Sequence, residues 1–186
     1  MLIGALGGAV YWLAAQLWPA NVAVILAMAA TGLLAGQIRV AASPDRIDWL
    51  SGLFFLLIKY NALMALSAAK LPFAVPANLT LGFIMICGYA ASYALLVLGV
   101  AARPEKTAVK LSAADLCLAL LIGFAPAALL GIPGLTGLAA AILVSLGFVA
   151  FLKVKRSAGS RDLLDMGQPL AEASFYLGAL ASWRFI

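Results

Sequence analysis

Residues 79–102 read LTLGFIMICGYAASYALLVLGVAA, without a single charged side chain. A bilayer core about 30 Å thick needs roughly 20 apolar residues of helix to cross it. This stretch is long enough, and Arg103 and Pro104 follow it directly. We expect it to be a membrane-spanning helix, because backbone polar groups in lipid must be hydrogen-bonded within their own segment.

The whole chain has the same apolar character. Of its 186 residues, 66% are apolar types and 10% are charged, and the mean hydropathy is +1.11. A soluble domain carries about 25% charged residues, so this chain has too little polar material to cover a surface in water. The length predicts one all-α domain, a polytopic membrane helical bundle over residues 1–186.

Seven apolar stretches are predicted to cross the bilayer. They cover residues 2–18, 21–38, 49–69, 79–102, 115–130, 134–152 and 169–183. Pro19 stops the first stretch, Pro126 interrupts the fifth, and residues 131–134 (GIPG) are predicted to form a tight turn. The first stretch lacks the basic n-region of a signal peptide, so we expect it to be retained.

The basic residues are distributed unevenly between the two sides of this bundle. When the loops are numbered alternately, those of one side hold Arg39, Arg46, Arg103, Lys106, Lys110, Lys153, Lys155, Arg156 and Arg161. The loops of the other side hold only Lys70 and Arg184. Because positively charged loops stay in the cytoplasm, we expect a cytoplasmic N-terminus and a multi-pass protein of a bacterial inner membrane.

Composition excludes several classes of function. The chain has no histidine, which rules out histidine-ligated zinc or haem and catalysis by a histidine base. Cys87 and Cys117 lie in apolar runs without a CxxC motif, so we expect both to be buried hydrophobic residues. The positive charge is explained by topology, and no basic stripe with interleaved aromatics indicates nucleic acid. We therefore predict no metal, no cofactor and no nucleic-acid partner.

Few polar side chains fall inside the predicted spans. Lys59 and Asn61 lie near the middle of the third, where a charge costs at least ~2.5 kcal/mol on insertion scales. Lys59 is therefore expected to face protein, with Glu172 of the last span as its candidate partner. The pair is interpreted either as structural or as part of a functional site. Asp115 opens the fifth span, where a carboxylate suits a helix N-terminus and predicts a cap.

The loop over residues 153–168 is the most polar part of the chain. It holds Ser160 and Asp162, with Arg161 between them and Asp165 close by. Such residues could bind Mg²⁺ and a phosphate, since magnesium is held by one or two carboxylates plus substrate phosphates. The alternative, a solvated basic loop that sets the topology, is favoured.

Four short motifs resemble the cobalamin synthase family, the adenosylcobinamide-GDP ribazoletransferases. Residues 2–8 (LIGALGG) are similar to its glycine-bearing first helix, and residues 102–105 (ARPE) match a segment that follows a serine-containing helix. Residues 157–162 (SAGSRD) stand where the family has a GGxTGD loop, and residues 170–172 (LAE) resemble its acidic last helix. The resemblance covers nearly the whole chain and implies the family's membrane-bundle fold.

The departures from the family concern its catalytic residues. The family's acidic LHxDGLADTxDG segment is replaced here by residues 34–46, which contain no histidine and only Asp45 as an acid. Arg161 stands where the family has the glycine before its aspartate. Since those aspartates are expected to hold Mg²⁺ at the diphosphate, the resemblance implies a retained fold without the activity.

We therefore expect a non-catalytic homologue that acts as a structural or accessory subunit of a larger membrane complex, with the lipid bilayer and other membrane subunits as its partners. One alternative is an active, Mg-dependent adenosylcobinamide-GDP ribazoletransferase. The other is a small-molecule carrier in which Lys59 and Glu172 line a cavity. No catalytic residue is assigned. The candidate polar site comprises Lys59, Asn61, Ser160, Asp162 and Glu172.

Overall fold

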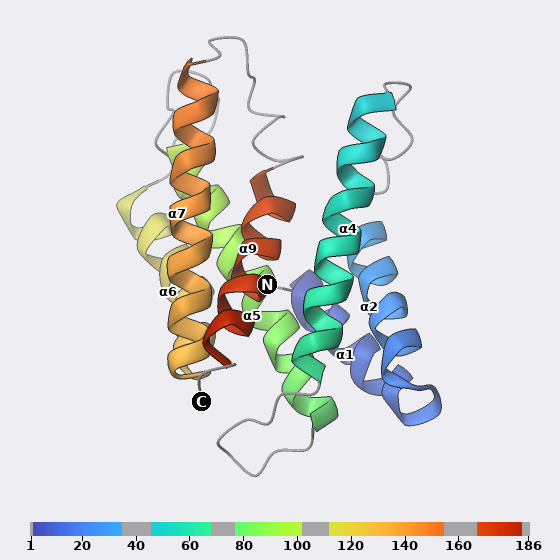
Figure 1. Ribbon diagram of the computed structural model, residues 1–186. Coiled ribbons are helices and arrows are strands. Elements are labelled where there is room, and N and C mark those ends of the chain that lie inside the picture. Colours follow the sequence, from blue (N-terminus) through green and yellow to red (C-terminus); the bar gives the residue numbers. More distant parts are fainter. Residues whose placement is uncertain (1, 35–45, 68–76, 102–111, 155–166, 184–186) are drawn as a thin grey trace.

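The computed structural model of the chain describes residues 2–34, 46–67, 77–101, 112–154 and 167–183. This described part is all-helical and contains no strand (Figure 1). Its helices are α1 (Leu2–Leu17), α2 (Ala20–Leu34), α4 (Arg46–Ser67), α5 (Ala77–Ala101), α6 (Ala113–Ala128), α7 (Ile132–Val154) and α9 (Gln168–Trp183). Each of the seven predicted stretches thus corresponds to one helix, with ends that differ by a few residues.

The predicted turn over residues 131–134 is partly wrong. The chain turns earlier, at residues 129–131, where Gly131 adopts φ 69°, a conformation that glycine tolerates best. Pro133 and Gly134 instead belong to the first turn of α7. Proline is accepted there because the first-turn amides have no partner within the helix. A Cβ on Gly134 would lie 1.8 Å from the Ala127 carbonyl oxygen, so this position has no room for a side chain.

Two helices of the described part are long and apolar enough to cross a membrane on their own. These segments are Leu79–Gly99 of α5 and Ile132–Phe151 of α7. By contrast, α1 and α6 have 16 residues and α2 has 15, and 16 residues correspond to about 24 Å at 1.5 Å per residue. The structure therefore supports an all-helical protein with two candidate spans.

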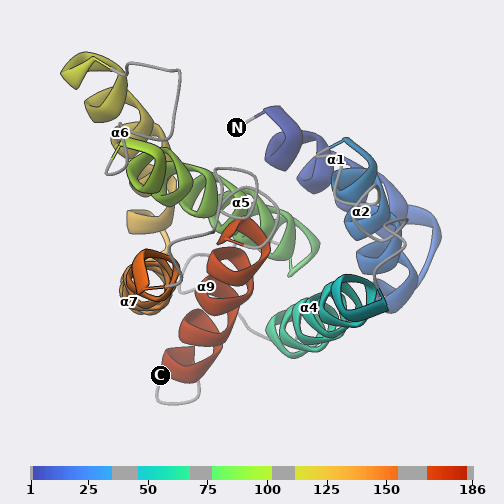
Figure 2. The ribbon, with the colours of Figure 1, turned by 90° about the horizontal axis from the view of Figure 1, so that it is seen from above.

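Helix α5 lies at the centre of the arrangement. It packs against α1, α4, α6, α7 and α9, as the view along the bundle shows (Figure 2). Its residues Ile84, Tyr89 and Ala90, which lie on different sides of the helix, are all buried. Such burial on several sides explains why α5 is apolar around its whole circumference.

The contact between α7 and α9 is the most extensive of the described helix pairs. A Cβ on Gly137 would lie 2.8 Å from the Phe175 carbonyl oxygen, and one on Gly178 would lie 2.7 Å from the Thr136 carbonyl oxygen. Glycines thus let the two backbones approach closely. The Thr136 hydroxyl also lies 2.8 Å from Ser182 Oγ, which links the helices by a polar contact.

Successive helices run in alternating directions through the bundle (Figure 1). The last residues of α2, α5 and α7 and the first residues of α4, α6 and α9 are directed toward the same end. These are the helix ends that flank the lysine- and arginine-rich segments of the sequence. The alternation therefore agrees with the division into two sides that the sequence predicts.

The prediction for Asp115 is confirmed, whereas that for the cysteines holds for one of the two. Ser112 is the N-cap of α6, and its Oγ accepts a hydrogen bond from the Asp115 amide at 3.1 Å. The Asp115 carboxylate in turn accepts from the Ser112 amide at 3.0 Å, which completes a capping box. Cys87 is buried in α5, but Cys117 on α6 is exposed.

Candidate functional site

Lys59 lies on the buried stripe of α4. The side chains of Lys59, Ala62, Leu63 and Leu66 are all buried, at the spacing of one helix face. Phe54 and Leu57, which precede Lys59 in α4, are 61% and 49% exposed on the opposite side of the helix. The charge is therefore directed into the protein, as the sequence predicts.

Glu172 on α9 meets Lys59 across the helix interface. The distance between Lys59 Nζ and Glu172 Oε1 is 2.7 Å, and the two side chains are 9% and 3% exposed. A buried charge without a partner is strongly unfavourable, whereas a close pair with further hydrogen bonds offsets much of the desolvation. The predicted acidic neighbour of Lys59 is thus confirmed, and the pair joins α4 to α9.

Tyr176 is a third member of the site that sequence reasoning missed. Its hydroxyl donates a hydrogen bond to Glu172 Oε1 at 2.8 Å and lies 3.3 Å from the Met85 carbonyl oxygen of α5. Gly88 makes room for the ring, since a Cβ there would lie 2.4 Å from Tyr176 Cε1. The same carboxylate oxygen therefore accepts from both Lys59 and Tyr176, and the site connects three helices.

Gln168 and Tyr89 extend this polar cluster toward the first turn of α9. The Tyr89 hydroxyl lies near the Gln168 amide group and the Glu172 carboxylate. The exposed fractions are 9% for Gln168 and 4% for Tyr89. Gln168, Glu172 and Tyr176 are spaced by four residues, which places them on one helix face. That spacing is the signal by which the sequence could have indicated them.

The other predicted site residues do not join Lys59 and Glu172. Asn61 is exposed, and its Nδ2 donates to the Leu57 carbonyl oxygen at 2.8 Å. It borders a shallow apolar depression of about 390 Å³ between α4 and α9. Ser160 and Asp162 lie outside the described residues. Within the described part, no three His, Cys, Asp or Glu side chains gather in a way that could hold a metal ion.

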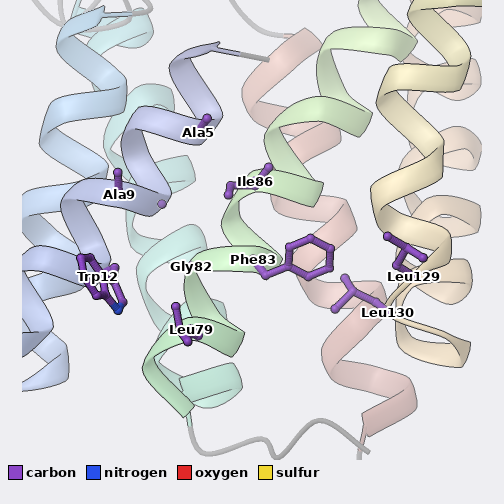
Figure 3. A pocket seen from close by; sticks show the side chains of 10 residues that line it. Ala5, Ala9, Trp12, Leu79, Gly82, Phe83, Ile86, Leu129 and Leu130 are labelled. Carbon is purple, nitrogen blue, oxygen red and sulfur yellow. The ribbon is translucent and has the colours of Figure 1, made fainter. Parts of the chain in front are cut away.

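A larger groove lies elsewhere, between α1, α5 and the α6–α7 turn (Figure 3). It has a volume of about 660 Å³ and is almost entirely apolar. Its lining includes Ala5, Ala9 and Trp12 from α1, and Phe83 and Leu130 from the facing elements. Neither this groove nor the depression at Asn61 is lined by Lys59 or Glu172.

The geometry of the cluster suits a structural connection better than chemistry. The charges of Lys59 and Glu172 neutralise each other, and the short contact to Tyr176 occupies the same carboxylate oxygen. Neither side chain is accessible for contact with a substrate, because both are more than nine-tenths buried. No known protein family, curated protein or solved structure matches the chain.

Proposed function

We propose that this chain is a multi-pass protein of a bacterial inner membrane and serves as a non-catalytic, structural subunit of a membrane complex. The observation that carries the proposal is the distribution of polarity. Apart from Arg46, Asp48 and Lys153 near the ends of α4 and α7, the described residues include three charged ones, namely Lys59, Asp115 and Glu172. Two of these are buried as a pair, and Asp115 caps a helix end. A protein that folds in water has the opposite distribution.

The outer surface supports the same proposal. Leu143 on α7 is 70% exposed, Leu121 on α6 is 67% exposed and Phe54 on α4 is 61% exposed. In water, each exposed Å² of such surface forgoes roughly 25 cal/mol of burial free energy. When the same side chains contact lipid tails, they are out of water and this free energy is not forgone. The lateral faces of the helices are therefore the surfaces that the protein can offer to lipid and to other membrane subunits.

The proposal includes a bilayer crossing by each of the seven helices, with the N-terminus in the cytoplasm. The alternating helix directions and the nine-to-two distribution of basic residues support it. The shorter helices α1, α2 and α6 need a thinner local bilayer. A shortfall of several ångströms is commonly accommodated by thinning of the bilayer or by flanking residues that reach the interface.

Descent from the cobalamin synthase fold is part of this proposal and rests on the four motifs alone. The acidic segment that would hold Mg²⁺ in that family is missing from residues 34–46. Without the carboxylates of that segment, the metal that would neutralise a diphosphate loses the ligands that the family provides for it. We therefore infer that the chain does not catalyse ribazole transfer.

A carrier function is the weaker alternative. It requires Lys59 and Glu172 to border a cavity through which a solute could pass. Both are enclosed by α4, α5 and α9 instead, and the groove in Figure 3 is lined by other residues. The ion pair therefore supports a role in holding helices together.

Two experiments test the proposal. The tagged protein, extracted gently from its native membrane, should migrate on a native gel with a second membrane protein in fixed stoichiometry. Migration only as a folded monomer or homo-oligomer would contradict the subunit role. In a strain that lacks its own cobalamin synthase, expression of the chain should not restore growth. Growth that depends on the gene and is lost in Asp162→Ala would show that the enzyme is active.

A further inference from the structure

Asn61 presents a polar side chain to the outside of the bundle. It is exposed, and the apolar segment Leu53–Ser67 of α4 extends about 9–12 Å beyond it in either direction at 1.5 Å per residue. Its Nδ2 donates to the Leu57 carbonyl oxygen at 2.8 Å, which uses one of the two amide hydrogens. Among the described residues, no further hydrogen bond engages the second hydrogen or the Oδ1 acceptor.

The surroundings of this amide follow from the proposed function. The inference rests on the membrane crossing of α4, but not on the role as a subunit. Inside the hydrocarbon region no water is available to an exposed amide, so a free donor and a free acceptor are strongly unfavourable there. Asparagine side chains in membrane helices commonly form hydrogen bonds to another helix. The position of Asn61 therefore indicates that a further helix packs against this side of α4.

The residues around Asn61 form a surface that can receive such a helix. Phe54, Leu57, Ile58 and Asn61 are all exposed and follow one another at i, i+3, i+4 and i+7, the spacing of one helix face. All four line the depression of about 390 Å³ whose other wall belongs to α9. Phe54 is 61% exposed at this depression. The face thus combines a strongly exposed ring with a recess, which allows two such faces to interlock.

We propose that this face of α4 binds the same face of a second copy of the chain, in a dimer whose twofold axis is parallel to the membrane normal. An amide group is both a donor and an acceptor, so the two Asn61 side chains can satisfy each other with two reciprocal hydrogen bonds. All copies insert with the same orientation, because the same charged loops determine it. The twofold axis therefore brings both Asn61 side chains to the same depth. An unrelated helix would need a polar group at that depth by coincidence.

Cross-linking in native membranes tests the contact face. In a background without Cys87 and Cys117, Leu57→Cys lies on the face beside Asn61, and Leu56→Cys is the matched control. The two leucines are 49% and 44% exposed, but Leu56 is about 140° from Asn61 around the helix. Oxidation with copper–phenanthroline should link Leu57→Cys into a dimer of the chain and leave Leu56→Cys monomeric. Equal yields, no dimer, or a link from Leu57→Cys to a different protein would overturn the proposal.

Substitution of Asn61 tests the amide itself. Asn61→Leu should weaken dimerisation roughly tenfold, which corresponds to two interhelical hydrogen bonds of average strength in membranes. The bundle should stay folded, because the described hydrogen bond of Asn61 lies within its own helix. Asn61→Gln retains an amide and should keep most of the dimer. Förster transfer between copies fused to donor and acceptor fluorescent proteins, in liposomes of varied lipid-to-protein ratio, measures all three proteins. Unchanged dimerisation of Asn61→Leu would overturn the proposal.

Alkaline carbonate extraction of the same membranes separates this proposal from the one on which it rests. A protein that resists extraction but does not cross-link through Leu57→Cys would contradict the dimer and leave the membrane crossing intact. A protein that carbonate releases would contradict the membrane crossing, and the dimer with it.

Discussion

Helix α9 packs against α4, α5 and α7, and its contacts with α7 and with α4 differ in kind. Toward α7, the glycines Gly137 and Gly178 bring the backbones together, and Thr136 adds a neutral polar contact. Toward α4, the principal polar connection is the pair of Lys59 and Glu172, supported by Tyr176. The first interface depends on the absence of side-chain volume, and the second depends on the presence of two opposite charges.

This difference determines how each interface responds to substitution. A glycine interface loses stability when volume is added, in proportion to the overlap. A charged interface loses most when one partner is removed, and much less when both are removed together. The α4–α9 contact therefore makes stronger demands on the identity of individual residues than the α7–α9 contact does.

The largest effect is expected from breaking the ion pair. Lys59→Met leaves the buried carboxylate of Glu172 without its partner, and Glu172→Gln leaves the buried ammonium of Lys59 beside a neutral amide. Each single variant should lower the free energy of unfolding by about 3–5 kcal/mol. The double variant carries no charge, and the amide oxygen introduced by Glu172→Gln can still accept from Tyr176, so its loss should be smaller than that of either single variant. Thermal unfolding in detergent measures all three. If the double variant lost as much stability as the two single variants together, the ion pair would not be the reason why each single substitution is destabilising.

The next effect concerns the glycine interface. Gly137→Ala places a Cβ 2.8 Å from the Phe175 carbonyl oxygen and should destabilise the protein by about 1–3 kcal/mol. Gly147→Ala is the matched control on the same helix, because no atom lies within 4 Å of its added Cβ. The control should be neutral or slightly stabilising, since alanine favours helix. Equal unfolding temperatures for both variants would contradict close backbone packing at Gly137.

A smaller effect is expected from Tyr176→Phe. This change removes the 2.8 Å hydrogen bond to Glu172 but keeps the ring in the space opposite Gly88. We expect a loss of about 1–2 kcal/mol, the upper range for side-chain hydrogen bonds within membranes. In the charge-free double variant, where the acceptor is a neutral amide, the same substitution should have a weaker effect. The comparison is made by chemical unfolding of the wild type and the double variant, each with and without Tyr176→Phe. An equal loss of stability in both backgrounds would show that the Tyr176 hydrogen bond does not depend on the ion pair.

The smallest effect is expected from Thr136→Val. Valine keeps the shape of threonine but removes the contacts to Gly178 and Ser182 across the α7–α9 interface. Interhelical hydrogen bonds in membranes contribute about 0.6 kcal/mol on average, so Tm should fall only slightly. A loss as large as that of Lys59→Met would mean that polar contacts, and not glycine packing, dominate this interface.

The helices were predictable because each lies within a run of apolar residues. The misplaced turn at residues 131–134 arose from Pro133, which was interpreted as a helix breaker although it lies in a first turn. The Lys59–Glu172 contact could also be predicted, because so few charges lie within the apolar stretches that each has few possible partners. Asn61 was a poor candidate on geometry alone: it is two residues from Lys59, and positions i and i+2 of a helix face different directions.

Tyr176, Tyr89 and Gln168 could not be assigned with the same ease. Gln168 is the first residue of α9, where a polar side chain can equally face water, and Tyr89 and Tyr176 lie near the middle of their helices, where a tyrosine can be buried for its ring alone. Their presence in the sequence therefore does not indicate an internal polar site. Only the packing of α9 against α5 shows that these side chains face inward. The four-residue spacing from Gln168 to Tyr176 becomes informative once Glu172 is known to be buried.

The central claim is that this chain is a multi-pass membrane bundle with its basic segments in the cytoplasm, and cysteine accessibility tests it most directly. In a background without Cys87 and Cys117, single cysteines are introduced at Ser43, Ser157 and Ala74, and sealed right-side-out cells are treated with an impermeant thiol reagent. We expect labelling of Ala74→Cys in intact cells, and of Ser43→Cys and Ser157→Cys only after the membrane is opened. Labelling of Ser43→Cys or Ser157→Cys in sealed cells would contradict the claim.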